Sequence, residues 1–185
     1  LHAQMNPHFI FNSLNSIRAL IDENPEQARK AITRISNILR NSITKQEATD
    51  TLENELTLVD DYLALEKIRF EERISFSKEI DPASLQIQIP TMMLQTLVEN
   101  AIKHGISRLE AGGHIHIKTM YKENKLHIEV SNSGSLDHSA HQENSLGFGL
   151  NSTRQRLKLL YTDQPSFDIF EKDGMVHVLI KIKTT

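Results

Sequence analysis

Residues 97–105 read LVENAIKHG, and this stretch says most about the fold. Three polar side chains, those of Asn100, Lys103 and His104, recur three to four residues apart, as they do on one face of a helix. An amide oxygen can ligate Mg²⁺, and an ammonium group one turn later can meet phosphate oxygens. Gly105 then predicts the end of the helix. The stretch is a candidate magnesium and phosphate site, and the alternative is the polar face of a capped surface helix.

Four segments around this helix alternate apolar and polar residues, which is typical of half-buried strands. They are ISFSKEI (74–80), HIHIKTM (114–120), KLHIEV (125–130) and MVHVLIKI (175–182). Asp173-Gly174 precedes the last of them and predicts a tight hairpin turn. Helices are expected from near Pro90 and from about Leu150 to Tyr161. We therefore expect strands that share one sheet covered by helices, after an all-helical front third, so that the fold class is α+β.

Three further features flank this expected sheet. The segment KLHIEV runs into Ser131-Asn132-Ser133-Gly134, which combines an amide acceptor with a flexible glycine. Residues 135–146 are polar and without regular period, as in a loop that closes over a ligand. Gly147-Phe148-Gly149-Leu150 then opens a helix, and its glycines let backbone amides approach phosphate groups at the positive helix end. The three features and Asn100 together indicate a nucleotide site.

The front third predicts two antiparallel helices and a third helix after them. The apolar positions of the first are Ile10, Leu14, Ile17 and Ile21, and those of the second are Ala28, Ala31, Ile32, Ile35, Ile38 and Leu39. A break at Asp22-Glu23-Asn24-Pro25 separates the two helices. Asp50 and Glu53 are spaced like a capping box for the third helix, whose expected buried face is Leu52, Leu56, Val59 and Leu63.

His8 is the candidate nucleophile, within LHAQMNPHFIFNSLN at residues 1–15. On a helix, Gln4, His8, Asn12 and Asn15 share one polar stripe, which exposes the imidazole. Pro7 predicts either a helix that starts at Asn6 or a kink at the histidine. A neutral imidazole is a competent nucleophile towards a phosphoryl group. The alternative is an ordinary surface or capping histidine, and Asn12 is equally compatible with an unremarkable surface amide.

The run around His8 resembles the phosphoacceptor segment of the LytS-type sensor histidine kinases, and VENAIKHG resembles the magnesium-binding segment of the Bergerat, or GHKL, ATP-binding fold. The resemblance implies a Bergerat-fold α/β sandwich with a mixed sheet covered by helices on one face. It implies ATP and Mg²⁺ as cofactors, Asn100 as the metal ligand, and Asn132 in place of the family's aspartate as the acceptor for the adenine amino group. Cofactor contacts are expected from Lys103, His104, Gly134, Gly147, Gly149 and Leu150.

The same resemblance implies that Asn12 orients a water that removes the phosphoryl group from a response regulator, while Phe9 stands where many histidine kinases carry an acid. The chain departs from the family at Ser152, where an asparagine is usual, and lacks a second glycine after Gly134. The role of Glu99 stays open. Implied partners are a second copy of the chain and a regulator, often of the LytTR type.

Composition limits the other functions. With 21 basic and 24 acidic residues the chain offers no broad cationic surface, so no direct contact with nucleic acid is expected. It has no cysteine, which excludes disulfides and thiolate zinc sites. No apolar run is long enough to span a bilayer. We expect a soluble catalytic piece from the cytoplasmic side of the inner or plasma membrane, with any sensor or membrane anchor upstream.

The expected organisation is a dimerisation and phosphotransfer hairpin at residues 1–45, a linking helix at 46–72 and an ATP-binding domain at 73–185. Autophosphorylation on His8 is the preferred activity. A related ATPase would carry a glutamate four residues before Asn100, where this chain has Thr96, which cannot act as a base at neutral pH. A catalytically silent dimeric scaffold that binds nucleotide weakly is the second hypothesis.

Overall fold

The computed structural model describes residues 6–44, 47–136 and 147–184 of the chain. Its helices are α1 (Pro7–Glu23), α2 (Pro25–Thr44), α3 (Leu52–Phe70), α4 (Met93–Asn100) and α5 (Gly147–Leu160). Its strands are β1 (Thr49–Thr51), β2 (Ile74–Glu79), β3 (Gln88–Pro90), β4 (Gly113–Lys122), β5 (Lys125–Ser133), β6 (Ser166–Lys172) and β7 (Met175–Lys183). A π-helix, Ala101–Gly105, and a 3-10 turn, Ile106–Arg108, continue α4, and two more 3-10 turns lie at Glu71–Arg73 and Pro82–Ser84.

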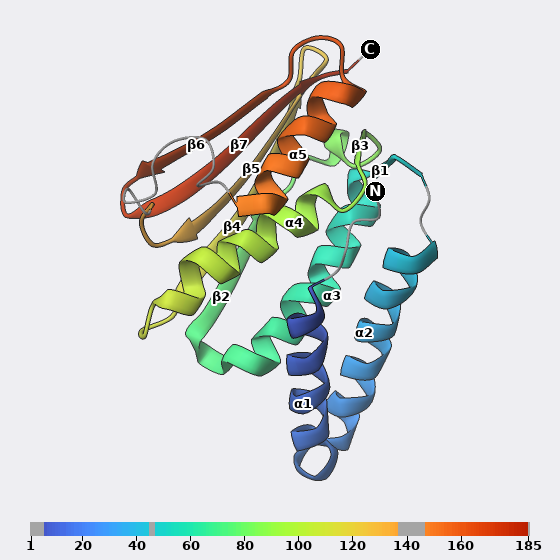
Figure 1. Ribbon diagram of the computed structural model, residues 1–185, viewed down its shortest axis with the longest axis vertical. Coiled ribbons are helices and arrows are strands. Elements are labelled where there is room, and N and C mark those ends of the chain that lie inside the picture. Colours follow the sequence, from blue (N-terminus) through green and yellow to red (C-terminus); the bar gives the residue numbers. More distant parts are fainter. Residues whose placement is uncertain (1–5, 45–46, 137–146, 185) are drawn as a thin grey trace.

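Helices α1 and α2 form the predicted antiparallel hairpin, which lies beside α3 (Figure 1). Asn6 caps α1, since its side chain accepts a hydrogen bond from the His8 backbone N–H at 3.0 Å. Pro7 occupies the first turn, where its missing amide hydrogen costs nothing. The helix therefore begins at Pro7, with Asn6 as its cap. Of the two expectations, a helix start or a kink at this place, the structure shows the helix start.

The buried face of α1 differs from the expected one. Phe9, Ser13 and Ile17 are buried, whereas Leu14 and Ile21 are 49% and 52% exposed. Docking of α1 against α3 places Phe9 inward, and this rotates the predicted apolar face partly toward solvent. The expected polar stripe includes Gln4, which lies outside the described residues.

Helix α3 buries the four positions expected for it: Leu52, Leu56, Val59 and Leu63. The predicted capping box was wrong, because the cap is Thr51, whose hydroxyl accepts a hydrogen bond from the Asn54 backbone N–H at 3.3 Å. Asp50 supports this cap from one residue earlier, where its Oδ1 accepts from the Thr51 N–H at 2.8 Å. Thr51 therefore ends β1 and begins α3.

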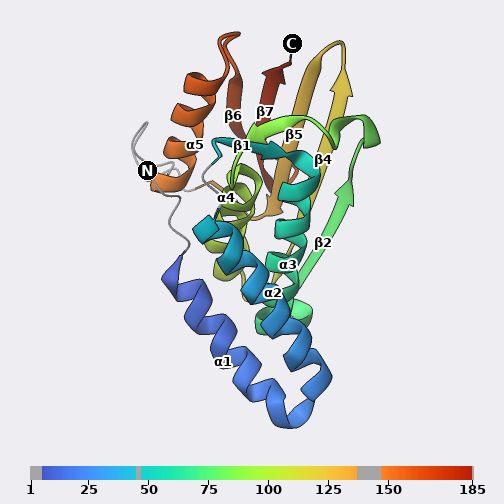
Figure 2. The same cartoon turned by 90° about the vertical axis from the view of Figure 1, so that its right-hand side faces the viewer.

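A five-stranded mixed sheet forms the other layer, in the order β2-β4-β5-β7-β6. Strands β2 and β4 pair in parallel, and the remaining pairs are antiparallel. Residues such as Ile115, Ile117 and Ile128 point into the core, and α3, α4 and α5 cover that face (Figures 1 and 2). Asp173 and Gly174, both with positive φ, form the predicted turn between β6 and β7. The α+β prediction is confirmed.

Three strands, β1, β3 and β6, were not predicted from the sequence. The strands β1 and β3 pair with each other through Thr49 and Pro90, and β6 adds the sheet edge. The helix expected near Pro90 consequently begins at Met93. Among the described residues, no helix combines the length and the apolar character that crossing a membrane requires.

Candidate functional site

The sequence motifs that flank the mixed sheet converge at the end of α4. A Cβ placed on Gly149, in the first turn of α5, would lie 3.1 Å from Thr96 Cγ2 and 3.2 Å from Asn100 Nδ2. A Cβ placed on Gly105 would lie only 2.1 Å from Asn132 Nδ2. The end of α4 therefore contacts the first turn of α5 on one side and the end of β5 on the other.

Asn100 is held in one orientation by its own helix. Its Nδ2 donates to the Thr96 carbonyl oxygen at 2.7 Å, which leaves Oδ1 as the ligand atom of the amide. The hydroxyl of Thr96 is engaged as well, since it donates to the Met92 carbonyl oxygen at 2.7 Å. Asn100 thus turns its Nδ2 toward the first turn of α5 and keeps Oδ1 as its possible ligand atom.

The π-helix that follows α4 ends at Gly105, as predicted, but a 3-10 turn follows it directly and Gly105 is not a left-handed cap. Residues Ala101–Gly105 widen into a π-helix, and Gly105 has φ −99°, which is not the left-handed conformation of a helix cap. Gly105 is needed for another reason, because any side chain there would collide with Asn132. A π-helical turn of this kind is often found at functional sites.

Asn132 and Gly134 lie where β5 leaves the sheet. Asn132 is buried, and its Nδ2 donates to the Ser133 carbonyl oxygen at 2.9 Å, so that Oδ1 can accept a hydrogen bond. Gly134 has φ +126°, a conformation that side chains rarely adopt, and a Cβ there would lie 3.6 Å from the Gly105 Cα. The expected lid loop follows at once, but its residues 137–146 lie outside the described residues.

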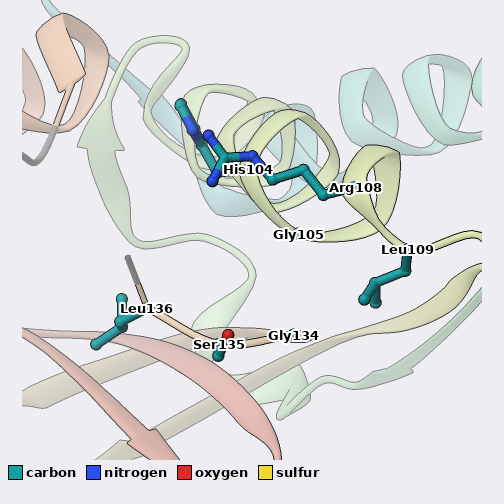
Figure 3. A pocket seen from close by; sticks show the side chains of 7 residues that line it. All are labelled: His104, Gly105, Arg108, Leu109, Gly134, Ser135 and Leu136. Carbon is teal, nitrogen blue, oxygen red and sulfur yellow. The ribbon is translucent and has the colours of Figure 1, made fainter. Parts of the chain in front are cut away.

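A cavity of about 270 Å³ opens between these two segments. It is lined by His104, Gly105, Arg108, Leu109, Gly134, Ser135 and Leu136 (Figure 3). Figure 3 shows His104 and Arg108 on one side of it, and Ser135 and Leu136 on the other. Partial burial, with the positive charges of Lys103 and Arg108 nearby, lowers the pKa of His104 below its ordinary value. The imidazole is therefore neutral at physiological pH.

The remaining predicted residues are close by or lie on α5. Lys103 is exposed on the π-helix. Gly147 is the first residue of α5, and Leu150 buries its side chain, which leaves only its backbone for a ligand. The sequence did not single out Arg108 or Leu136, because neither belongs to a motif.

His8 lies on α1, apart from this cavity. Its ring is exposed, and among the described residues its side-chain hydrogen bond is to Asn12, with 3.1 Å between Asn12 Nδ2 and His8 Nδ1. The next residue, Phe9, packs on Tyr62 of α3 with ring centroids 4.4 Å apart. Helix α3 therefore connects α1, which carries His8, to α4 and the mixed sheet.

A family model described as histidine kinase matches residues 1–74, a range that contains His8, Asn12 and Tyr62. This segment belongs to the histidine kinase family. The chain is 33% identical over 183 residues to the sensor histidine kinase BtsS of Escherichia coli K12, covering 98% of this chain and 32% of BtsS. It is 35% identical over 180 residues to the sensor protein LytS of Staphylococcus saprophyticus, covering 91% of this chain and 30% of LytS. The chain is thus LytS-like and spans about a third of the length of these curated relatives.

Solved histidine kinases share the fold. The catalytic domain of ThkA superposes with a TM-score of 0.55 at 20% identity, over 74% of this chain and 96% of that domain. A crystal structure of the histidine kinase ThkA in complex with the response regulator TrrA gives 0.53 at 19% identity, over 96% of this chain and 59% of that one. The helical segment and the mixed sheet thus have the arrangement of a histidine kinase catalytic portion.

Proposed function

We propose that the chain is the catalytic portion of a two-component sensor histidine kinase, which transfers the γ-phosphoryl group of Mg-ATP to His8. The phosphoryl group then passes to an aspartate of a response regulator. The observation that carries this proposal is the double contact at the end of α4, where Gly149 meets Asn100 and Gly105 meets Asn132. These contacts bring a possible metal ligand, a possible adenine acceptor and a helix N-terminus together at the end of α4.

The residues at the site suit Mg-ATP. Mg²⁺ prefers oxygen ligands and is commonly bound by one or two protein oxygens, by phosphates and by water. Asn100 Oδ1 fits that role, and the described residues hold no cluster of three His, Cys, Asp or Glu that would favour another metal. When bound, the ion neutralises charge on the phosphates. The amides from Gly147 to Leu150 at the N-terminus of α5 suit the phosphates, and Asn132 Oδ1 suits the adenine amino group.

His8 is a suitable phosphoryl acceptor. Its imidazole is exposed in the first turn of α1, a turn that contains no acidic residue. A neutral ring nitrogen attacks the γ-phosphorus, an N–P bond forms, the bond to the bridging oxygen breaks and ADP leaves. The phosphoryl group adds negative charge at the positive end of α1, where the helix dipole stabilises it.

Hydrolysis of ATP is less well supported. The position of the water-activating glutamate in related ATPases is Thr96, and its hydroxyl is committed to the Met92 carbonyl oxygen. A silent scaffold remains the alternative because Asn132 replaces a charged acceptor, which weakens adenine binding by about 1 kcal/mol.

Incubation of the protein with γ-labelled ATP and Mg²⁺ tests the proposal. We expect acid-labile, alkali-stable label that disappears in His8→Gln and persists in a control variant of a half-buried histidine of β5, His127→Gln. Nucleotide binding without label would support the scaffold. Released phosphate without labelled protein would support an ATPase.

The proposal includes two partners. Exposed Phe11, Leu14 and Ile21 are spaced three and seven residues apart on α1, which suits a second hairpin and hence a homodimeric four-helix bundle. A response regulator, with a LytTR-type domain as the family resemblance implies, is the expected phosphate acceptor, and the ThkA–TrrA complex supports a regulator as partner. In the full-length protein this portion would lie on the cytoplasmic side of the membrane, downstream of a sensor.

A further inference from the structure

Within the described part of the chain, the ring of His8 is engaged at one nitrogen. Asn12 Nδ2 lies 3.1 Å from His8 Nδ1, one helical turn away, and this is the side-chain hydrogen bond that the described residues give to the ring. The Asn6 cap fixes the backbone of that turn, and Phe9 is buried against Tyr62. Nδ1 thus has the Asn12 amide as its partner, and the side chain that carries Nε2 is exposed.

A neutral imidazole has one protonated and one nucleophilic nitrogen. With the Asn12 amide donating to Nδ1, the ring proton must be on Nε2, and that nitrogen cannot attack phosphorus. A 180° turn of the amide exchanges its oxygen and nitrogen. The Asn12 oxygen then accepts the Nδ1–H, and the lone pair of Nε2 is free.

We propose that Asn12 is a positioning residue that sets the tautomer of His8, so that phosphorylation occurs on Nε2. This inference rests on the proposed kinase function and deepens it. As Nε2 bonds to the γ-phosphorus and ADP leaves, positive charge develops on the ring, and the Asn12 oxygen stabilises the Nδ1–H through its hydrogen bond. An amide is too weak a base to take that proton, which passes to water at the exposed ring. The reaction therefore needs no acidic residue to make up for the one that is missing at Phe9.

Three variants test this role. Asn12→Ala removes the acceptor, and we expect about a tenfold lower kcat for autophosphorylation with the KM for ATP unchanged. Asn12→Asp supplies an acceptor that cannot donate, and we expect it to restore the rate to at least the wild-type value. Asn15→Ala, which alters another exposed asparagine of α1, is the matched control and should behave like the wild type.

Nuclear magnetic resonance of ¹⁵N-histidine-labelled protein reports the atoms themselves. In the wild type we expect phosphoryl on Nε2 alone, and in Asn12→Ala a mixture of both isomers. In unphosphorylated protein, Asn12→Asp should move the His8 proton to Nδ1, a readout independent of kinase activity. The inference would be overturned if Asn12→Ala kept the wild-type kcat and the same phosphorylated nitrogen but dephosphorylated a regulator more slowly. That result would instead support a water-orienting role for Asn12. Absence of label in the wild type would instead count against the kinase itself.

Discussion

The ring of Phe9 packs against the ring of Tyr62, with centroids 4.4 Å apart and planes inclined by 31°. Phe9 follows His8 directly, and Tyr62 is a buried residue of α3. This pair packs the first turn of α1 against α3.

Phe9→Ala should lower the free energy of unfolding by about 3 kcal/mol, because it removes a buried aromatic side chain and leaves a cavity. Urea denaturation followed by circular dichroism measures this change. Leu159→Ala on α5 is the control, since Leu159 is 84% exposed and lies off the proposed dimer stripe, and it should cost well under about 1 kcal/mol. Equal losses in the two variants would mean that α1 does not dock on α3 through Phe9.

Glu55 is a buried carboxylate that caps α4 from α3. It accepts hydrogen bonds from the backbone N–H groups of Met92 at 2.7 Å and Leu94 at 3.2 Å. Glu55→Gln should destabilise the protein by about 2 kcal/mol, because the new amide group cannot accept from both donors. The control is Glu53→Gln, an exposed change on the same helix that should cost less than about 0.5 kcal/mol in the same denaturation experiment.

Gly105→Ala should weaken nucleotide binding without unfolding the sheet. Its Cβ would collide with Asn132 and push apart the two segments that line the cavity, so we expect at least about a tenfold weaker affinity for Mg-ATP by calorimetry. Gly174→Ala is a control that introduces backbone strain without a steric collision. Gly174 has φ +72°, and no atom lies within 4 Å of the added Cβ. That control should lose some stability and keep its nucleotide affinity; equal affinities in the two variants would contradict the site.

Glu66 gives the protein a pH-dependent stability. Burial raises the pKa of Glu66 above its usual 4.5, and the charge of Arg69 and the hydrogen bond with Tyr62 offset only part of this rise. Because the pKa is higher in the folded state, Glu66 makes its full contribution to stability below pH 4.5. That contribution is lost as pH rises through the folded pKa. Glu66→Gln should therefore gain stability relative to the wild type as pH rises from 4.5 towards 7.5, in thermal melts across that range.

Glu26 offers a control of opposite sign. Its hydrogen bond and charge interaction with Lys30 lower its pKa, so its contribution is present above pH 4.5 and is lost as pH falls through the lower folded value. Glu26→Gln should show no relative gain between pH 4.5 and 7.5. A parallel gain in both variants would argue against burial of Glu66 as the cause.

Leu14→Asp with Ile21→Asp should convert a homodimer into monomers, because both changes place charge on the exposed apolar stripe of α1. Light scattering at several protein concentrations measures the association. Asn15→Asp with Ala19→Asp introduces two acids at other exposed positions of α1 and should leave the dimer intact. A wild-type protein that stays monomeric would contradict the proposed bundle.

The sequence pattern predicted those elements whose signals are local. Apolar alternation identified β2, β4, β5 and β7, and Asp173-Gly174 identified their last turn. The short strands β1 and β3 escaped, because three residues carry no period and each depends on a partner far along the chain. The π-helix escaped for a similar reason, since it accompanies the contact between Gly105 and Asn132.

Part of the candidate site was also predictable from sequence, and part was not. Asn100, Asn132 and Gly149 belong to motifs, and the structure brings them together. Arg108 and Leu136 line the cavity only because of how the chain turns after Gly105 and Gly134. The buried face of α1 was misjudged because its partner, Tyr62, decides which way the helix faces.

Helix α3 has a practical consequence for anyone dividing the protein. A fragment that began at β2 would lose the Glu55 carboxylate, so the first amides of α4 would have no protein acceptor. It would also lack ten side chains that α3 buries, and the uncovered core would favour aggregation. A nucleotide-binding fragment suitable for screening should therefore begin upstream of Thr49, with β1 and α3 retained.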